Sequence, residues 1–359
     1  MGDASLVDWG LARRTARVVA SRGPHDVGSW VPGQAEVSAA CEEALGAASA
    51  YTGLAAQERP APELVGREQW AHGALGTLGE ASAQIEAKLD AELSMPGPLA
   101  DLMRRLAGTA AGVEAGVAVG YAARRVLGQY DVSLIGARRA PRLLLVGPNI
   151  ATARVELAAA PATFLRWIAL HETTHVLQFE GVPWLEGHLR DLIGELIAGA
   201  GGALEPRELA RRMLRGDPRR LLRSILRGEL VEALLGDGRR KVFDRLQGAM
   251  AALEGHAEHV MDVCAATVDP DIRDLRRRLE LRRSSRAGLG DVVARLLGLE
   301  SKLRQYRLGK TFCDAIVDRG GVEAQVALWK APANLPSLEE LEAPDRWLDR
   351  VGIVTPTAA

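Results

Sequence analysis

The chain has 359 residues, and its 45 lysines and arginines balance 46 aspartates and glutamates, for a formal net charge of -1. Hydrophobic residues make up 47% and charged residues 25%, a composition that excludes a disordered chain. The balanced charge also excludes a generic nucleic-acid binder, which needs a basic excess to neutralise phosphates.

Most of the chain has apolar residues at helical spacing, in segments that Gly and Pro residues separate. Alanine, leucine, arginine and glutamate dominate these segments, and all four favour helices. We predict helices at Ser5–Ala20, Val37–Ala50, Gly79–Leu93, Pro98–Arg125, Pro161–Phe179, Glu186–Ala198, Glu205–Arg215, Arg219–Leu235, Lys241–Ala266 and Gly290–Gly320.

One stretch has β character. The short apolar runs Asp131–Ile135 and Leu143–Val146 flank a Gly-Ala-Arg-Arg-Ala-Pro turn and predict a small hairpin or sheet. The expected fold class is therefore mainly α with a small β sheet (α+β). We expect an N-terminal helical region at 1–130, a second region at 131–350 that packs with it into one compact unit, and a tail at 351–359.

The most apolar stretch, Leu106–Gly128, is interrupted by Glu114 and has small residues in place of Leu, Ile and Phe. Gly112, Gly116 and Gly120 share one helical face, where another backbone can approach closely. We expect a packed interior helix and no membrane span. The N-terminus lacks a secretory signal, and the three cysteines are distant from one another, so we expect reduced thiols in a cytoplasmic protein.

The residues His171-Glu172-Thr173-Thr174-His175 form an H-E-x-x-H pattern on a predicted helix. Histidines four positions apart share one helical face and can bind one zinc ion, while Glu172 flanks that face as a general base toward a water molecule. The histidines also share the apolar stripe of Phe164, Ile168 and Phe179. Imidazoles on a buried stripe need partners, and a metal ion is the partner that this spacing favours.

A catalytic zinc site needs a third protein ligand. In the predicted helix Lys241–Ala266, Glu254 is the polar residue that lies closest to the apolar stripe, so we predict Glu254 as that ligand. His256 is the second candidate for this ligand, or it acts in catalysis as an oxyanion donor. Glu258 lies one turn after Glu254, and we expect its carboxylate to accept a hydrogen bond from the ring nitrogen of a ligand histidine that does not bind zinc. Glu186 and His188 are further candidate ligands.

The sequence motifs of other catalytic and nucleotide-binding sites are absent. The chain has no G-x-S-x-G nucleophile elbow and no G-x-G-x-x-G after a strand. Gly309-Lys310-Thr311 ends like a phosphate loop, but Arg304 replaces the glycine that such a loop requires.

Short segments spread over most of the chain match one known family, at residues 7–9, 126–131, 146–150, 171–175, 178–179, 183–185, 253–257, 260–262, 302–306, 309–310 and 312–314. In these segments the chain resembles the actinobacterial family of zincin-type zinc metalloproteases that is labelled as associated with deazaflavin coenzyme biosynthesis. The resemblance implies a mostly helical fold with a small sheet beside the zinc helix. It also implies zinc at His171 and His175 and a catalytic Glu172, and Glu254 is similar to the glutamate of the E-G-x-A pattern in gluzincin-type proteases.

We therefore expect a zinc-dependent hydrolase that acts on a peptide or related amide substrate, with Zn²⁺ as cofactor. His256 or His259 would stabilise the oxyanion, and the strand Leu143–Val146 would bind an extended peptide by edge pairing. Two different functions stay open beside this one: a zinc-binding scaffold or regulatory protein without proteolytic activity, and an amidohydrolase for a non-peptide substrate in coenzyme metabolism.

Overall fold

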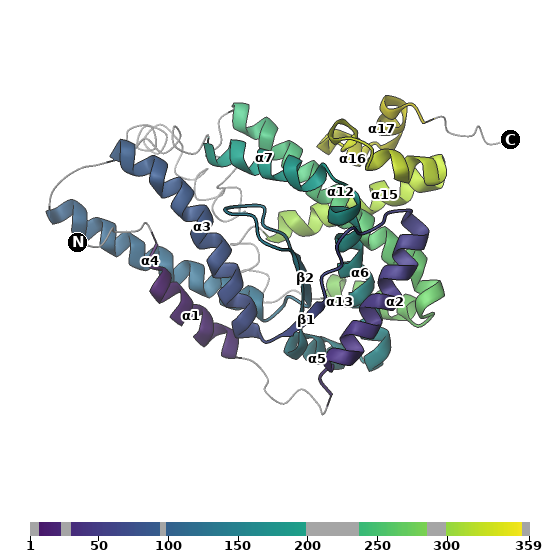
Figure 1. Cartoon of the computed structure of the whole chain (residues 1–359), viewed down its shortest axis with the longest axis horizontal. Coiled ribbons are helices and arrows are strands. Elements are labelled where there is room, and N and C mark those ends of the chain that lie inside the picture. Colours follow the sequence, from purple (N-terminus) through teal and green to yellow (C-terminus); the bar gives the residue numbers. More distant parts are fainter. Residues whose placement is uncertain (1–6, 23–29, 94–97, 199–236, 286–298, 354–359) are drawn as a thin grey trace.

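The computed structural model describes residues 7–22, 30–93, 98–198, 237–285 and 299–353. Helices dominate, and one small three-stranded sheet accompanies them (Figure 1), which confirms the predicted fold class. The predicted helices Glu205–Arg215 and Arg219–Leu235 and most of the predicted tail at 351–359 lie outside the described residues, as does the start of Gly290–Gly320.

The sheet consists of β1 (Pro62–Val65), β2 (Gly128–Asp131) and β3 (Arg142–Val146), in the order β1-β3-β2. β1 runs parallel to β3, and β2 runs antiparallel to it. β3 is buried on both faces, which explains its continuous apolar sequence. Two sequence-based expectations are corrected. The strand predicted at Asp131–Ile135 is found at Gly128–Asp131 and shares only Asp131 with the prediction, and β1 was not predicted.

The helices follow the predicted segments closely, with added turns at several ends. α5, α13, α16 and α17 were not predicted, and α3 begins twelve residues before the predicted Gly79. The helices are α1 (Trp9–Ser21), α2 (Gln34–Thr52), α3 (Arg67–Leu93), α4 (Pro98–Ala123), α5 (Gly147–Glu156), α6 (Pro161–Gly181), α7 (Leu185–Ala198), α12 (Asp237–Val268), α13 (Ile272–Ser285), α15 (Leu299–Leu328), α16 (Leu338–Glu342), α17 (Pro344–Val351) and the 3-10 helix η1 (Pro332–Asn334).

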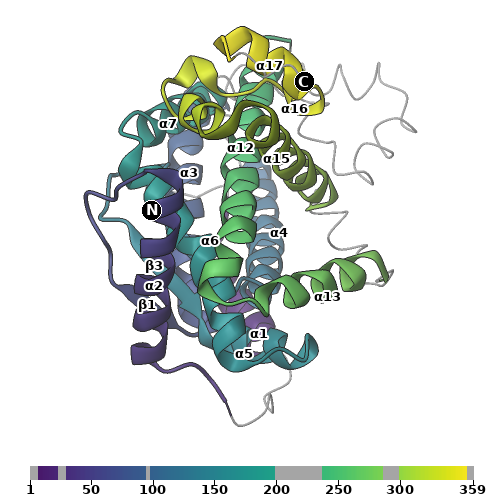
Figure 2. The same cartoon turned by 90° about the vertical axis from the view of Figure 1, so that its right-hand side faces the viewer.

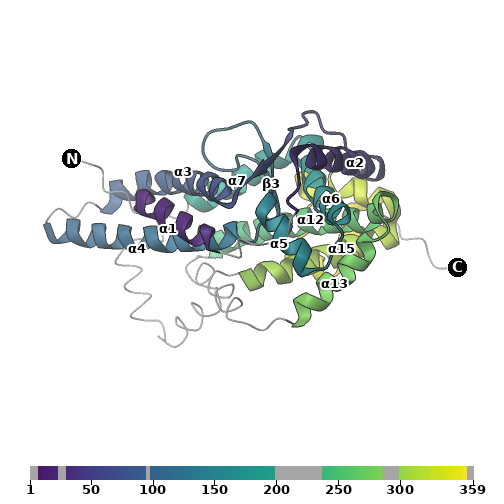
Figure 3. The same cartoon turned by 90° about the horizontal axis from the view of Figure 1, so that it is seen from below.

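α1, α3 and α4 form a layer that extends away from the sheet (Figure 3). The glycine face of α4 packs on α1 as expected: a Cβ atom at Gly116 would lie 2.5 Å from the carbonyl oxygen of Ala12. Within the described residues, the segment Arg105–Ala123 of α4 is long and apolar enough to span a membrane, with a mean hydropathy of 1.2. Only 33% of this segment is buried, and Leu106, Val113 and Val117 are exposed, so α4 packs along one face and is not the interior helix that the sequence predicts. One such segment is weak evidence for a membrane.

The predicted boundary between residues 130 and 131 falls inside β2. α2, from the predicted N-terminal region, packs against α6 and α12, and β1 pairs with β3. The chain before residue 130 therefore contributes to the same core as the motif helix.

α12 is the central helix of the larger part of the molecule and packs against α2, α6, α7 and α15 (Figure 2). Ala249, Ala251, Ala252 and Leu253 of α12 belong to a core shared with α7, α15 and α17. Val260, Met261, Cys264 and Ala265, further along α12, belong to a core shared with α2 and α6. Glu254 lies between these cores. Gly255 and Gly309 bring the backbones of α12 and α15 together, since a Cβ atom at Gly255 would overlap the carbonyl group of Gly309.

Candidate metal centre

α6 carries both histidines of the H-E-x-x-H pattern on one face. The helix begins at Pro161, whose fixed φ and missing N–H suit a first turn, and it continues to Gly181. The Nε2 atoms of His171 and His175 lie 3.3 Å apart, and both imidazoles are partly buried. The helix therefore directs two nitrogen ligands toward one point, as the spacing predicts.

α12 brings the carboxylate of Glu254 to the same point. Its Oε2 atom lies 3.5 Å from Nε2 of His171 and 3.7 Å from Nε2 of His175. Atoms that each lie about 2.0–2.2 Å from a tetrahedral zinc ion are separated by roughly 3.3–3.6 Å. Two imidazoles and one carboxylate are also a donor set that zinc accepts. The residues present therefore fit a zinc ion, and among the described residues they are the cluster with metal-ligand geometry.

Electrostatics at this cluster favour a cation. Burial opposes the charged form of His175, but the carboxylates of Glu254 and Glu172 and the hydrogen bond to Gln178 together raise the pKa of His175 to about 9. Burial alone would raise the pKa of Glu254, yet His175 and His171 hold it well below its usual range. Protons and metal ions compete for the same lone pairs, so this charge pattern also suits a metal ion.

Glu172 lies beside the three ligand residues and is buried. Its carboxylate packs against Gly128 of β2, where an added Cβ atom would lie 2.6 Å from the Glu172 side chain. The backbone N–H of Tyr130 donates a hydrogen bond to this carboxylate. Burial, assisted by Glu254, raises the pKa of Glu172, although His171 and His175 oppose this shift. β2 thus fixes the carboxylate without adding a positive charge next to it.

A cavity of about 220 Å³ opens onto this cluster. His171, Glu172, His175 and Glu254 line it from one side. The remaining walls are β2 and apolar side chains of the following segment and of α6 and α12, namely Val132, Leu134, Phe179, Met250 and Leu253. The ligand atoms and Glu172 are therefore accessible to one small volume with mostly apolar walls.

A family model described as zincin-like metallopeptidase matches residues 7–348. The chain belongs to this family. A crystal structure from Chloroflexus aurantiacus, described as a proposed hydrolase with a novel fold, is similar to the chain with a TM-score of 0.66 and 26% identity, over 96% of this chain and 99% of that one. No curated protein sequence matches the chain.

The family and the structural neighbour together support a zinc metallohydrolase. The peptidase reaction, the actinobacterial origin, the deazaflavin association and the cytoplasmic location stay predictions.

Gln178 is a residue of the zincin-like site that the sequence analysis missed. Nδ1 of His175 lies 2.8 Å from Oε1 of Gln178 and donates to it. The amide nitrogen of Gln178 donates to the carbonyl of Leu253, at 2.9 Å, and to Nδ1 of His256, at 3.0 Å. Gln178 thus connects a ligand-bearing turn of α6 to the turn of α12 that carries Glu254. Its position three residues after His175, on the same helical face, was the available signal.

The structure corrects the role expected for Glu258. This side chain lies 3.1 Å from Arg276 of α13 and does not contact either motif histidine. The reason is its position on α12: one turn after Glu254, the side chain is directed toward α13, while Gln178 occupies the space behind His175. The hydrogen bond that orients the ligand comes from α6 itself.

His256 does not fit the catalytic role expected for it, or that of a third ligand. Its side chain is 1% exposed and does not line the cavity. Nδ1 accepts the hydrogen bond from Gln178, Nε2 is buried without a hydrogen-bond partner in the described part of the chain, and the ring meets Trp329 edge-on, with centroids 5.2 Å apart. Burial, followed by the charges of His259 and His175, lowers its pKa to about 3, so the imidazole is neutral.

His259, Glu186 and His188 also lie away from the metal cluster. His259 lies between Tyr51 and Asp314, at 2.7 and 2.8 Å, on the other side of α12. Glu186 lies 3.5 Å from Arg138 and 3.9 Å from Arg190. His188 lines a separate cavity.

Proposed function

We propose that the protein is a zinc-dependent peptidase in which His171, His175 and Glu254 hold the metal and Glu172 is the general base. The proposal rests on one observation: three ligand atoms at zinc-like separations converge beside a buried carboxylate in a cavity. Among the described residues no fourth ligand joins the cluster, which favours a catalytic site over a structural one.

Zinc in such a site lowers the pKa of a water molecule and polarises a substrate carbonyl. Glu172 would accept the proton from that water and later deliver it to the leaving amine. The raised pKa of Glu172 suits both steps. At neutral pH its protonated and ionised forms are closer in free energy than those of a solvated glutamate, so Glu172 can both accept and release a proton. The Tyr130 backbone N–H and the close contact with Gly128 keep the carboxylate at one position throughout.

The substrate strand would lie along β2. The expectation that Leu143–Val146 offers a free edge is corrected, because β3 pairs with β1 on one side and with β2 on the other. The backbone hydrogen bond between Val146 and Leu127 sets the register, so the N–H and C=O of Gly128 and of Tyr130 point away from β3. The N–H of Tyr130 already donates to Glu172, which leaves the N–H and C=O of Gly128 and the C=O of Tyr130 for a substrate strand. These groups line the cavity. An extended peptide paired there would pass directly over the cluster.

The cavity itself is smaller than the roughly 300–1,000 Å³ that drug-sized ligands occupy. We infer that it holds the residues next to the scissile bond, while the rest of a peptide follows the edge of β2. Its apolar walls favour an uncharged side chain at this position.

The decisive experiment measures zinc content by mass spectrometry together with cleavage of a quenched fluorescent peptide library. We expect one zinc per chain, and Glu172→Gln to retain zinc while losing about 10²–10⁴-fold in kcat/KM. Glu186→Gln is the matched control on the adjacent helix and should retain both zinc and activity. Native protein without zinc, or peptidase activity that survives Glu172→Gln, would contradict the proposal. Cleavage of N-acyl amides but no peptides would favour an amidohydrolase instead.

A further inference from the structure

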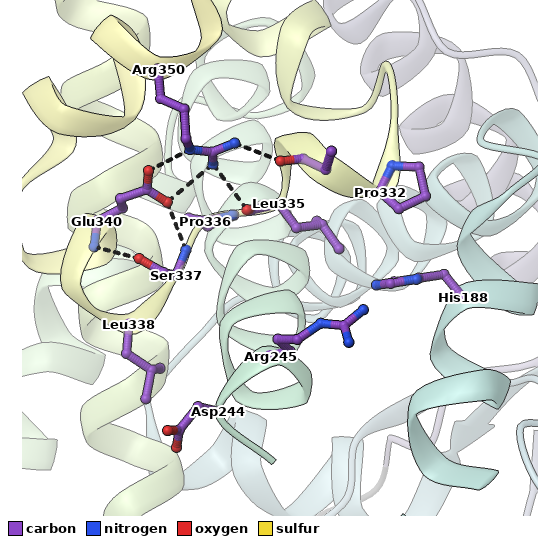
Figure 4. A pocket seen from close by; sticks show the side chains of 11 residues that line it. His188, Asp244, Arg245, Pro332, Leu335, Pro336, Ser337, Leu338, Glu340 and Arg350 are labelled. Carbon is purple, nitrogen blue, oxygen red and sulfur yellow. Dashed lines mark hydrogen bonds and ion pairs between the residues drawn. The ribbon is translucent and has the colours of Figure 1, made fainter. Parts of the chain in front are cut away.

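A second, larger cavity lies between α7, α12 and the segment that runs from η1 to α16 (Figure 4). Its volume of about 650 Å³ falls in the range of small-molecule sites. None of the metal-centre residues lines it, so it is separate from the site described above. Both cavities use α12: Arg245 lines the second one, and Glu254 lies nine residues further along the same helix.

One wall of this second cavity is held rigidly. The guanidinium of Arg350 donates to both carboxylate oxygens of Glu340, at 2.5 and 3.0 Å, and to the carbonyls of Ala333 and Leu335, at 2.5 and 3.2 Å. Glu340 also accepts from the backbone N–H of Ser337, at 2.8 Å. The charges of Arg350 and Glu340 are therefore matched to each other and are not available to a ligand.

The opposite wall carries charges without such partners. Arg245 is exposed and Asp244 is half-buried, and within residues 237–285 and the other described ranges neither side chain has an ion pair or hydrogen bond. Figure 4 shows the Arg245 side chain extending toward His188, while the carboxylate of Asp244 lies toward Leu338. Burial and the charge of Arg245 lower the pKa of His188, so its imidazole is a neutral hydrogen-bonding group. The cavity thus has a positive and a negative group at different places.

Between these charges the lining is apolar. Pro332, Leu335, Pro336 and Leu338 face the cavity from the segment that Arg350 and Glu340 hold in place. A ligand that matches this lining has a carboxylate for Arg245 and His188, an ammonium group for Asp244 and an apolar body in between.

We propose that this cavity binds a small zwitterion with apolar side chains, of the size of a free dipeptide. The carboxylate of the ligand pairs with Arg245 and accepts a hydrogen bond from His188, the ammonium group pairs with Asp244, and the side chains pack on Leu335 and Leu338. The inference does not rest on the proposed peptidase function, because no bond is broken in this cavity and binding is measured without turnover.

The test uses the full-length, zinc-loaded Glu172→Gln protein, so that the probe is not consumed. Leucyl-leucine is the probe, and its N-acetyl and C-terminal amide derivatives each lack one charge. Ligand-observed NMR should give saturable binding of leucyl-leucine with a dissociation constant on the order of 0.1–1 mM, as expected for a ligand of this size. We expect each derivative to bind at least tenfold more weakly.

Two charge-removing variants locate the site. Arg245→Gln and Asp244→Asn should each weaken leucyl-leucine binding about tenfold. A third variant, His188→Gln, identifies the C–H signal of His188 by its disappearance from the spectrum, and in the parent protein that signal should shift when the probe binds. Arg240→Gln, an exposed arginine on the same helix that does not line the cavity, is the matched control and should leave binding unchanged.

Several results would overturn the proposal: no saturable binding, equal binding of the N-acetyl or amide derivative, or binding that neither Arg245→Gln nor Asp244→Asn changes. Binding that is lost on chelation of zinc but kept in Arg245→Gln would place the dipeptide at the metal centre and would also overturn it.

Discussion

Two clusters on opposite sides of α12 contain histidines and carboxylates, and only one of them has the geometry of a metal site. In the cluster of His171, His175 and Glu254, the Nε2 and Oε2 atoms converge on one point at separations that suit a metal ion. In the other cluster, Nε2 of His259 meets the Tyr51 hydroxyl and Nδ1 meets Asp314, so both ring nitrogens already have a partner. A histidine whose two ring nitrogens both pair with residues of other helices connects those helices. A histidine with one ring nitrogen directed toward other ligand atoms can bind a metal ion.

The largest expected effect comes from deleting one imidazole in each cluster. His175→Ala removes a ligand, so zinc affinity should fall more than 100-fold and zinc should be absent from purified protein. His259→Ala is the matched change and should retain one zinc per chain, because neither nitrogen of His259 reaches the metal cluster. Zinc content by mass spectrometry checks both. Loss of zinc in His259→Ala alone would reverse the assignment of the two clusters.

The second effect concerns the hydrogen bond behind His175. Gln178→Leu removes the acceptor for Nδ1 of His175, and zinc affinity should fall about 10–100-fold, as for other partners of metal-ligating histidines. Competition with a fluorescent chelator measures this change. Gln325→Leu is the control, because Gln325 is equally buried and its amide atoms have no hydrogen-bond partner within the described residues. A similar loss of affinity in both variants would indicate a packing effect and contradict the orienting role.

The third effect is a pH dependence confined to the metal cluster. In metal-free protein the pKa of His175 is raised from its ordinary value of 6.5 to about 9. The protonated form of His175 therefore stabilises the fold, and this contribution is fully present below pH 6.5. That stability is lost as pH rises from 6.5 through 9. Because zinc must displace this proton, apparent zinc affinity should rise by up to about tenfold per pH unit over the same window. Chelator competition at pH 6, 7, 8 and 9 measures the slope, and Glu254→Gln should flatten it. A flat profile in the wild-type chain would contradict the coupling.

The smallest effect tests the connecting role of the other cluster. Tyr51→Phe removes the hydroxyl that contacts His259 and should lower the free energy of unfolding by about 1 kcal/mol in urea titrations. Zinc content and activity should be unchanged. A change in zinc affinity would show that the two clusters on α12 are coupled and would weaken the contrast between them.

The sequence was sufficient to predict the helix that carries the H-E-x-x-H pattern and the approach of Glu254 to its histidines, because both predictions depend on local residue spacing. The four-residue strand β1 was not predicted, since Pro62–Val65 is too short to show alternation and pairs with residues about eighty positions away. α5 was not predicted because it follows β3 without a loop, and Pro148 stands in the first turn of that helix. The errors at His256 and Glu258 have a different origin: a helical wheel gives the direction of a side chain but not the neighbouring helix that it meets.

The distance in sequence between α6 and α12 also has a consequence for biosynthesis. A ribosome that adds roughly 5–20 residues per second completes Glu254 roughly 4–16 s after His175. Gly309, which packs against Gly255 beside that glutamate, follows later still. The two histidines of α6 thus emerge well before the carboxylate that completes the cluster. A site with all three ligands can therefore form only after α12 has been synthesised, and a product that ends before α12 would contain the H-E-x-x-H pattern without the complete cluster.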